Sequence, residues 1–264
     1  MGDPKQEIVE AIQRMVVRLL ATTRSGVGLA LIGGFRYRLL DRGPRVSKGI
    51  DYHWGGELVD KRDELIAVFN RRLLPEVFRK FRYAGSAKPH CGPEGESPVV
   101  AVIQLAFWRD RQAYSRMEIP VDIVRISCLD DLTVKIIDGV AYPTLSDQDM
   151  IENKVIAVLA RNFLQHRDLL DTFLFANNLA FDSPERIDRK LAQIGVGVSR
   201  AADRLDALTA GRDRHIRAID DLIANQVDPD VAANLRLGGG AAMVFDSAAA
   251  TASRQAAVFL GDRP

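Results

Sequence analysis

The chain has 264 residues and a mass of 29.2 kDa, and 47% of its residues are hydrophobic, so it can bury the core of one large domain or two small ones. Its formal net charge of +1 argues against a surface covered in basic residues that binds nucleic acid indiscriminately. No apolar run reaches the length of a membrane helix and the first residues lack a signal-peptide pattern, so we expect a cytoplasmic protein with no membrane partner.

The N-terminal part of the chain predicts a helix, a short strand and a second helix. Apolar residues recur at helical spacing over residues 4–22. The apolar run 27–32 has the length of a strand and ends in Gly33-Gly34. We expect the second helix to begin near Phe35.

The middle of the chain predicts helical pieces followed by three strands. The pattern is helical from Leu58, and Pro75 divides that stretch because proline interrupts the helical hydrogen-bond ladder. The Gly- and Pro-rich segment 83–98 predicts a long loop. Strands are expected at residues 99–108, 119–126 and 134–137. Their alternation with helices predicts an α/β domain over residues 1–145.

The remainder of the chain is helical in pattern. Ser146 followed by Asp149 resembles a capping box at the start of a long helix. Later apolar residues at spacings of three and four predict a single helical stripe, at Ile187, Leu191, Ile194, Val198, Ala202, Leu205 and Leu208. Gly238-Gly239-Gly240 is expected to be a hinge before an Ala-rich segment, which forms a docked or a loose helix. We therefore predict a helical bundle over residues 146–225, within a second domain of residues 146–264.

Cationic residues gather in two places, where a solvated surface is the alternative to ligand binding. The first group is Arg36, Arg38, Arg42, Arg45 and Lys48, and the second is Arg71, Arg72, Arg79, Lys80 and Arg82.

The cysteines and histidines show no metal-ligand spacing. Cys91 and Cys128 are too few for a disulfide framework, so we expect a reduced compartment and two inert thiols. Of the four histidines, only His166 stands beside other candidate residues, and a surface position is its alternative.

Carboxylates on strands carry the chemical argument. Transfer of phosphoryl and nucleotidyl groups uses divalent ions held by carboxylates, and residues two apart on a strand share a face. The chain reads Leu31-Ile32-Gly33-Gly34-Phe35 and then Ser47-Lys48-Gly49-Ile50-Asp51-Tyr52. A glycine pair after a strand, then a helix and a strand of this kind, resembles the first motif of the AbiEii toxin-like nucleotidyltransferases, which belong to the DNA-polymerase-β-type superfamily.

Two further segments resemble the same family in the same order. Asp122, in Ile119-Pro120-Val121-Asp122-Ile123-Val124, stands where the family has a third carboxylate on a neighbouring strand. The family's Lys-x-x-Ala-x-x-x-Arg and Arg-Asp-x-x-Asp signature is matched by Lys154, Ala157, Arg161, Arg167, Asp168 and Asp171. The three segments together span residues 27–175.

The resemblance implies a nucleotidyltransferase-like α/β (α+β) sheet domain followed by a C-terminal helical bundle. In it Asp51 and Asp122 would hold Mg²⁺ and act in catalysis with Lys154 and Asp168. The NTP would be bound by Gly33, Gly34, Arg36, Arg38, Lys154 and Arg161. The glycines would let the backbone approach the phosphates, and the adjoining helix would present its N-terminal amides to them.

The helical motif also has an interpretation from spacing alone. Lys154, Arg161 and Asp168 are seven residues apart, so on one continuous helix they would share a face. We expect Lys154 to project toward the cleft that holds the two carboxylates. The structural alternative is an intramolecular Lys–Asp or Arg–Asp network.

The sequence departs from the family pattern at Gly49, where the first metal-binding Asp is expected. Two carboxylates can still hold one Mg²⁺, which commonly keeps several waters, but a two-ion arrangement would be weakened. Glu57 and Asp60 lie beyond the strand and are weaker substitutes. We expect Gly49 to share a face with Asp51, so that Gly49→Asp would restore a ligand.

The leading functional hypothesis is Mg-dependent transfer of a nucleotide from an NTP to a hydroxyl of RNA, such as a tRNA 3′ end, or of protein. The enzyme would be the toxin of a toxin–antitoxin pair, with a cognate antitoxin as partner. The alternative is a catalytically degenerate nucleotide- or antitoxin-binding protein with the same fold. A helical scaffold with an incidental sheet domain is a third hypothesis.

Overall fold

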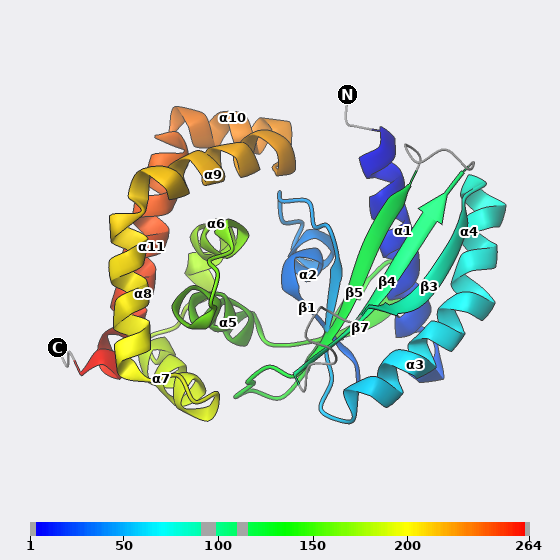
Figure 1. Ribbon diagram of the computed structural model, residues 1–264, viewed down its shortest axis with the longest axis horizontal. Helices are drawn as coiled ribbons and strands as arrows, with labels where there is room; N and C mark the ends of the chain where they lie inside the picture. Colours follow the sequence, from blue (N-terminus) through cyan, green and yellow to red (C-terminus); the bar gives the residue numbers. More distant parts are fainter. Residues whose placement is uncertain (1–3, 91–98, 110–115, 262–264) are drawn as a thin grey trace. The chain divides into compact units, whose positions relative to one another are not determined.

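The computed structural model describes residues 4–90, 99–109 and 116–261 (Figure 1). The chain divides into two compact units. The first extends to Thr144 but lacks residues 44–46 and 127–131, which belong to the second unit together with everything from Leu145 onward. The first unit is a mixed seven-stranded sheet with helices and the second is helical, so the predicted fold class is confirmed.

The first unit contains four α-helices among the described residues. They are α1 (Pro4–Ala21), α2 (Gly33–Leu40), α3 (Leu58–Val68) and α4 (Leu74–Phe81), with a 3₁₀ turn at Arg24–Gly26 and a π-helical turn at Phe69–Leu73. The strands are β1 (Ala30–Ile32), β2 (Ile50–His53), β3 (Ala84–His90), β4 (Val100–Trp108), β5 (Met117–Val124), β6 (Thr133–Ile137) and β7 (Val140–Thr144). Pro75 lies in the first turn of α4, where its missing N–H costs no helical hydrogen bond.

The sheet has the strand order β3-β4-β5-β2-β1-β7-β6. β2 pairs with β5 and β1 with β7 in parallel, while the other neighbours are antiparallel. The end of β1, where α2 begins, therefore lies next to the start of β2 near the middle of the sheet.

One face of the sheet is apolar and is covered by α1, α3 and α4 (Figure 1). Val121 and Ile123 of β5 and their partners Ile50 and Tyr52 of β2 point into this core and are almost completely buried. Because side chains alternate along a strand, the residues between them point to the opposite face. Asp51 and Asp122 are among those residues, so the core fixes the direction of both carboxylates.

The structure corrects three expectations in the first unit. Residues 84–90 form the edge strand β3 and not a loop, because seven consecutive residues pair with β4; the rest of the expected loop, 91–98, lies outside the described residues. Pro89 is tolerated there because an edge strand has one unpaired side. β7 was not expected, and α2 begins at Gly33 instead of near Phe35.

The second unit is built from seven α-helices among the described residues. They are α5 (Asp147–Ala160), α6 (His166–Phe175), α7 (Ser183–Gln193), α8 (Val198–Ala210), α9 (Arg212–Gln226), α10 (Pro229–Leu237) and α11 (Gly240–Leu260), with a 3₁₀ turn at Ala176–Asn178. The predicted cap is present, since the Ser146 hydroxyl accepts a hydrogen bond from the Asp149 N–H at 3.0 Å. α11 contacts α6, α7, α8 and α9 and is the central element of this unit (Figure 1).

The structure also corrects the helix boundaries in this unit. The expected single stripe is interrupted between α7 and α8, and Ile194 and Val198 at the break are each 48% exposed. The bundle extends beyond residue 225 through α10, which was not expected, and through the Ala-rich α11. That helix is docked, because Ala248 and Ala252 are completely buried. Within the part of the chain that the structure describes, no helix is long and apolar enough to cross a membrane.

Candidate active site

The turn from β1 into α2 brings backbone close to a carboxylate. Gly33 has a φ of +73°, a conformation that side chains other than glycine rarely adopt. A Cβ at this position would lie 2.0 Å from Oδ2 of Asp51, so the glycine leaves the space that the carboxylate occupies. The first turn of α2 follows directly, and the N–H groups of a helical first turn have no intrahelical acceptors. This turn therefore combines a carboxylate with a helix N-terminus that favours anions.

The two predicted metal-binding carboxylates lie side by side in the sheet. Asp51 of β2 and Asp122 of β5 are direct Cα partners in the parallel pair. Partners in neighbouring strands point to the same face and lie about 4.8 Å apart, so the two carboxylates can converge on one cation. Both side chains are half-buried on the face opposite the apolar core. The expected convergence is thus supported by the register.

Further polar residues share this face. The strand register forms a row of His90, Val102, Asp122 and Asp51 across β3, β4, β5 and β2. Lys88 of β3 lies on the same face one row away and is exposed. Sequence reasoning missed both β3 residues because Gly85 and Pro89 made the segment look like a loop.

His53 also lies on the carboxylate face, although it was not expected to be a site residue. It lies two residues after Asp51 on β2, and this spacing alone predicts that the two side chains share a face of the sheet. Its Nδ1 accepts a hydrogen bond from the Ile126 N–H at 3.3 Å, and burial lowers the pKa of the ring. A neutral imidazole next to Asp51 adds a hydrogen-bonding group without adding charge.

Gly49 is less open than the sequence suggests. It precedes β2 by one residue and would continue the register opposite Pro120 of β5. A Cβ at position 49 would lie 2.9 Å from both Cγ and the carbonyl oxygen of Pro120. The direction toward the carboxylate face is as expected, but a side chain at this position would have to displace Pro120.

The donor set fits one Mg²⁺ better than two. Asp51 and Asp122 supply hard carboxylate oxygens, and Mg²⁺ binds through one or two carboxylates together with waters and substrate phosphates. Among the described residues, no group of three or more His, Cys, Asp or Glu side chains is arranged to hold a metal ion. Glu57 precedes α3 and pairs with Arg125 at 3.1 Å, and Asp60 lies on α3, so neither replaces the missing ligand.

Arg36, which was expected to bind nucleotide, is held inside the sheet unit. Its side chain is completely buried, and its guanidinium donates to the Thr144 hydroxyl at 3.1 Å and pairs with Asp41. Arg38 pairs with Glu10 of α1 at 3.2 Å and donates to the Gly43 carbonyl. Arg36 therefore ties α2 to β7 and Arg38 ties it to α1.

The signature residues of the second unit form an ion-pair network. Lys154 Nζ lies 2.9 Å from carboxylate oxygens of both Asp168 and Asp171, and Arg161 pairs with Asp168 at 2.7 Å. Arg45 binds Asp171 through two hydrogen bonds of 2.7 and 2.8 Å. The condition for a shared helical face is not met, because α5 ends at Ala160 and α6 begins at His166. The three residues are brought together by this turn, and the arrangement is the structural alternative described above.

Burial and charge oppose each other in this network. Burial favours the neutral forms, but the charges of Lys154 and Arg45 outweigh it and lower the pKa of Asp171. The carboxylates of Asp168 and Asp171 likewise outweigh the burial of Lys154 and raise its pKa. Asp168 is 1% exposed and enclosed by its partners, and its catalytic role stays a prediction. Lys154 and Arg161 retain partial exposure, and their nucleotide-binding role stays a prediction.

A second buried ionic network was missed by the sequence reasoning. Lys190 lies 2.5 Å from Asp149 and 2.8 Å from Glu152, and all three side chains are completely buried. Arg186 joins the same two acids and also Asp130. These ions connect α5 to α7, and the near-complete pairing indicates a structural role.

Of the two cysteines, only Cys128 lies among the described residues. Cys128 is a half-buried thiol, and burial raises its pKa to about 11, which disfavours the nucleophilic thiolate at neutral pH. Cys91 lies outside the described residues.

Comparison with solved structures identifies the fold. MenT4, a nucleotidyltransferase toxin from Mycobacterium tuberculosis H37Rv, matches with a TM-score of 0.56 and 17% identity, over 98% of this chain and 85% of that chain. This chain has a nucleotidyltransferase fold. JHP933 from Helicobacter pylori matches with a TM-score of 0.49 and 14% identity, over 99% of this chain and 94% of that chain. No family model and no curated protein matches the sequence. The assignment of the nucleotidyltransferase fold thus rests on structural similarity alone.

Proposed function

We propose that this protein transfers a nucleotide from an NTP to an acceptor hydroxyl in a Mg²⁺-dependent reaction. The observation that carries the proposal is the direct pairing of Asp51 with Asp122, beside a glycine that makes room for the Asp51 carboxylate. The fold shared with MenT4 supports it.

The chain's own residues would contribute mainly by positioning. Asp51 and Asp122 would hold one Mg²⁺, which when bound neutralises charge on the triphosphate. The first-turn amides of α2 would receive phosphate oxygens at the backbone of Gly33 and Gly34. The acceptor oxygen forms a bond to the α-phosphorus while the bond from that phosphorus to the bridging oxygen breaks. Pyrophosphate leaves, and a carboxylate of the pair takes up the hydroxyl proton.

For the acceptor we propose RNA, with the tRNA 3′ end as the acceptor class, and for the biological role a toxin with a cognate antitoxin. The motifs at Asp51, Asp122 and Lys154 resemble those of AbiEii-like toxins, and MenT4 is itself named as a nucleotidyltransferase toxin. A protein hydroxyl is the other acceptor that the same chemistry would serve.

A second function is favoured by one observation. Gly49 lacks a carboxylate, and the described residues offer no third ligand near Asp51 and Asp122. A protein that binds NTP or an antitoxin without turnover is therefore the alternative proposal.

The first test is calorimetry of the purified protein with each of the four NTPs, with Mg²⁺ and with EDTA. We expect Mg²⁺-dependent binding of at least one NTP. Asp51→Asn and Asp122→Asn should each weaken it about tenfold or more, because a charged metal ligand is lost. Glu118→Gln is the matched control, since Glu118 lies on β5 on the same face as Asp122 but is exposed and pairs with Arg116.

The second test is incorporation of α-phosphate-labelled NTP into total RNA, purified tRNA or protein. Incorporation of label into RNA by the wild-type protein, and its loss with the Asp51→Asn variant, would support the enzyme proposal. Binding without incorporation into any acceptor supports the degenerate protein. If no NTP binds to the folded protein, the nucleotidyltransferase proposal is wrong.

A further inference from the structure

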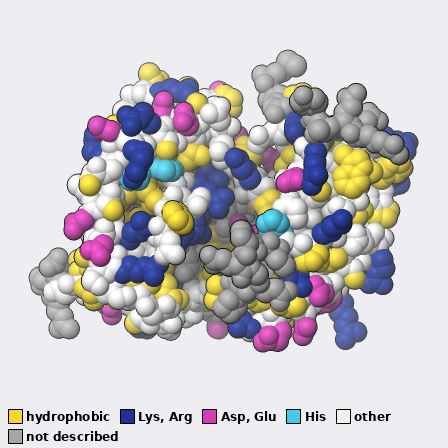
Figure 2. Space-filling view, viewed as in Figure 1, with side chains coloured by type: hydrophobic (Ala, Val, Ile, Leu, Met, Phe, Trp, Pro, Cys, Tyr) yellow, Lys and Arg dark blue, Asp and Glu magenta, His cyan; other side chains and the backbone are white. Residues whose placement is uncertain are grey.

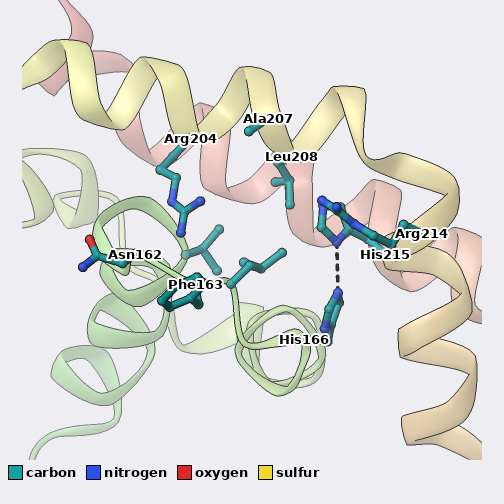
Figure 3. Close-up of a pocket in the computed structure, with 10 residues that line it drawn as sticks. Asn162, Phe163, His166, Arg204, Ala207, Leu208, Arg214 and His215 are labelled. Atoms are coloured by element: carbon teal, nitrogen blue, oxygen red, sulfur yellow. Dashed lines mark hydrogen bonds between the residues drawn. The ribbon is translucent and has the colours of Figure 1, made fainter. Parts of the chain in front are cut away.

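A pocket in the second unit has the chemistry of a ligand site that the proposed reaction does not use. It has a volume of about 270 Å³ and lies between the α5–α6 connection, the start of α6 and the facing sides of α8 and α9 (Figure 3). Val158 and Leu208, both buried, form apolar parts of its wall. His166, His215, Arg204 and Arg214 supply the polar part.

The two histidine side chains of the pocket are hydrogen-bonded to each other. His166 Nε2 lies 2.9 Å from His215 Nδ1, and the backbone of Ala207 is the other hydrogen-bond partner of His215. Since a backbone carbonyl only accepts, the contact with Ala207 favours a protonated ring nitrogen on His215. Phe245 stacks on the His215 ring at 5.8 Å and fixes its orientation. The pair is thus a positioned group and not a pair of mobile surface side chains.

The charge around the pocket is positive. No acidic side chain is among its lining residues in the described part of the chain. Burial lowers the pKa of both histidines, and the nearby charge of Arg214 lowers both further. Among the described residues no carboxylate is found paired with Arg214, whereas the neighbouring Arg212 is paired with Asp246 at 2.7 Å. Figure 2 shows a histidine among Lys and Arg side chains over α6 and α9.

A large aromatic side chain stands at the rim. Phe163 lines the pocket and is 81% exposed, and the side chain of Arg204 points toward it (Figure 3). Arg204 is anchored there by a hydrogen bond of 2.8 Å to the Arg161 carbonyl. An exposed ring beside a cationic pocket offers a stacking surface next to a site for an anion.

We propose that this pocket binds a nucleoside monophosphate unit, with the phosphate at Arg214 and His166 and the base on Phe163. Such a unit is either a free nucleotide or the phosphate-bearing end of an RNA. The pocket needs no divalent ion, so its ligand is distinguishable from the NTP proposed at Asp51 and Asp122.

The test is calorimetry in EDTA, which removes metal-dependent binding at the sheet. The probes are AMP, GMP, CMP and UMP, the four nucleosides, and inorganic phosphate. We expect at least one monophosphate to bind about tenfold or more tightly than its nucleoside, because a phosphate bonded to a charged group is the stronger contact. A further probe is a short RNA with a terminal phosphate. If it binds more tightly than the monophosphate, the ligand is an RNA end. If it binds more weakly, the ligand is the free nucleotide.

Matched variants locate the ligand. Arg214→Gln should weaken monophosphate binding about tenfold, whereas Arg217→Gln, an exposed arginine on the same helix outside the pocket, should change it less than twofold. Phe163→Ala should weaken nucleotide binding about fivefold or more and leave inorganic phosphate unchanged. Phe181→Ala is its control, because Phe181 is fully exposed elsewhere in the unit.

Three results would overturn the proposal. They are the absence of monophosphate binding to the folded wild-type protein, equal binding of nucleosides and monophosphates, and equal effects of Arg214→Gln and Arg217→Gln. Binding of an acidic peptide in place of any monophosphate would also assign the pocket to a different ligand.

Discussion

Gly33→Ala tests whether the turn before α2 exists to make room for Asp51. A methyl group at this position meets two separate costs. The backbone cost of placing an L-residue at positive φ is about 1–2 kcal/mol. The steric cost arises because the new Cβ would lie 2.0 Å from Oδ2 and 2.7 Å from Cγ of Asp51, and forced overpacking costs about 1–3 kcal/mol. The expected loss of unfolding free energy is therefore about 2–5 kcal/mol, within the 5–15 kcal/mol of a typical domain.

Gly139→Ala isolates the backbone cost. Gly139 lies in the turn between β6 and β7 of the same unit, has a φ of +72° and has no atom within 4 Å of its ideal Cβ. Urea unfolding followed by circular dichroism should show a loss of about 1–2 kcal/mol for Gly139→Ala and a larger loss for Gly33→Ala. Calorimetry should show Mg²⁺-dependent NTP affinity that is unchanged in Gly139→Ala and about tenfold weaker in Gly33→Ala, because Asp51 is displaced. Equal destabilisation by the two variants, with equal NTP affinity, would refute the reasoning.

Three further predictions concern the missing ligand and the ion-pair network. Gly49→Asp alone should gain little Mg²⁺-dependent NTP affinity by calorimetry, because its Cβ meets Pro120. Gly49→Asp combined with Pro120→Ala, which removes the ring contact and leaves the carbonyl contact, should gain more than the matched Gly49→Asn double variant, and equal affinities would show that the carboxylate is not limiting. Lys154→Ala should lower the free energy of unfolding in urea by about 3–5 kcal/mol, since it leaves two buried carboxylates short of a partner; unchanged NTP affinity in the folded variant would remove its predicted ligand role. The pKa of Asp171 is lowered in the folded protein, so its stabilising contribution is present above its unfolded pKa and is lost as the pH falls through the folded value. In urea unfolding at a series of pH values, Asp171→Asn should therefore reduce the fall of the midpoint concentration at acid pH. Asp206→Asn, at an exposed position, should not change that fall. Parallel curves for Asp171→Asn and wild type would contradict this.

The elements with a strong local signal were predictable from the sequence. The helix that begins after Ser146 carries its own cap, and the strand around Asp122 alternates buried and polar residues. The pairing of Asp51 with Asp122 followed from motif order, because both lie on apolar strands that must be buried on one face.

The parts that failed depend on partners distant in sequence. β3 contains Gly85 and Pro89, and only its pairing with β4 makes it a strand. Arg36 belongs to a cationic run in the sequence, yet it is buried and donates to Thr144, which lies 108 residues away. The spacing of Lys154 and Asp168 suggested a shared helical face, whereas a turn between two helices brings them into contact. No periodicity in a single sequence contains these long-range contacts.

The short segment 44–46 has a consequence for how the chain can be divided. It belongs to the second unit although the sheet unit continues on both sides of it, and residues 127–131 do the same. Arg45 holds Asp171, and the N–H groups of Leu129 and Asp130 bond Asp149. A fragment that starts at residue 145 would lack all of these partners. During synthesis the donors therefore emerge before the carboxylates that they bind, so these contacts can form only after α5 and α6 have been made.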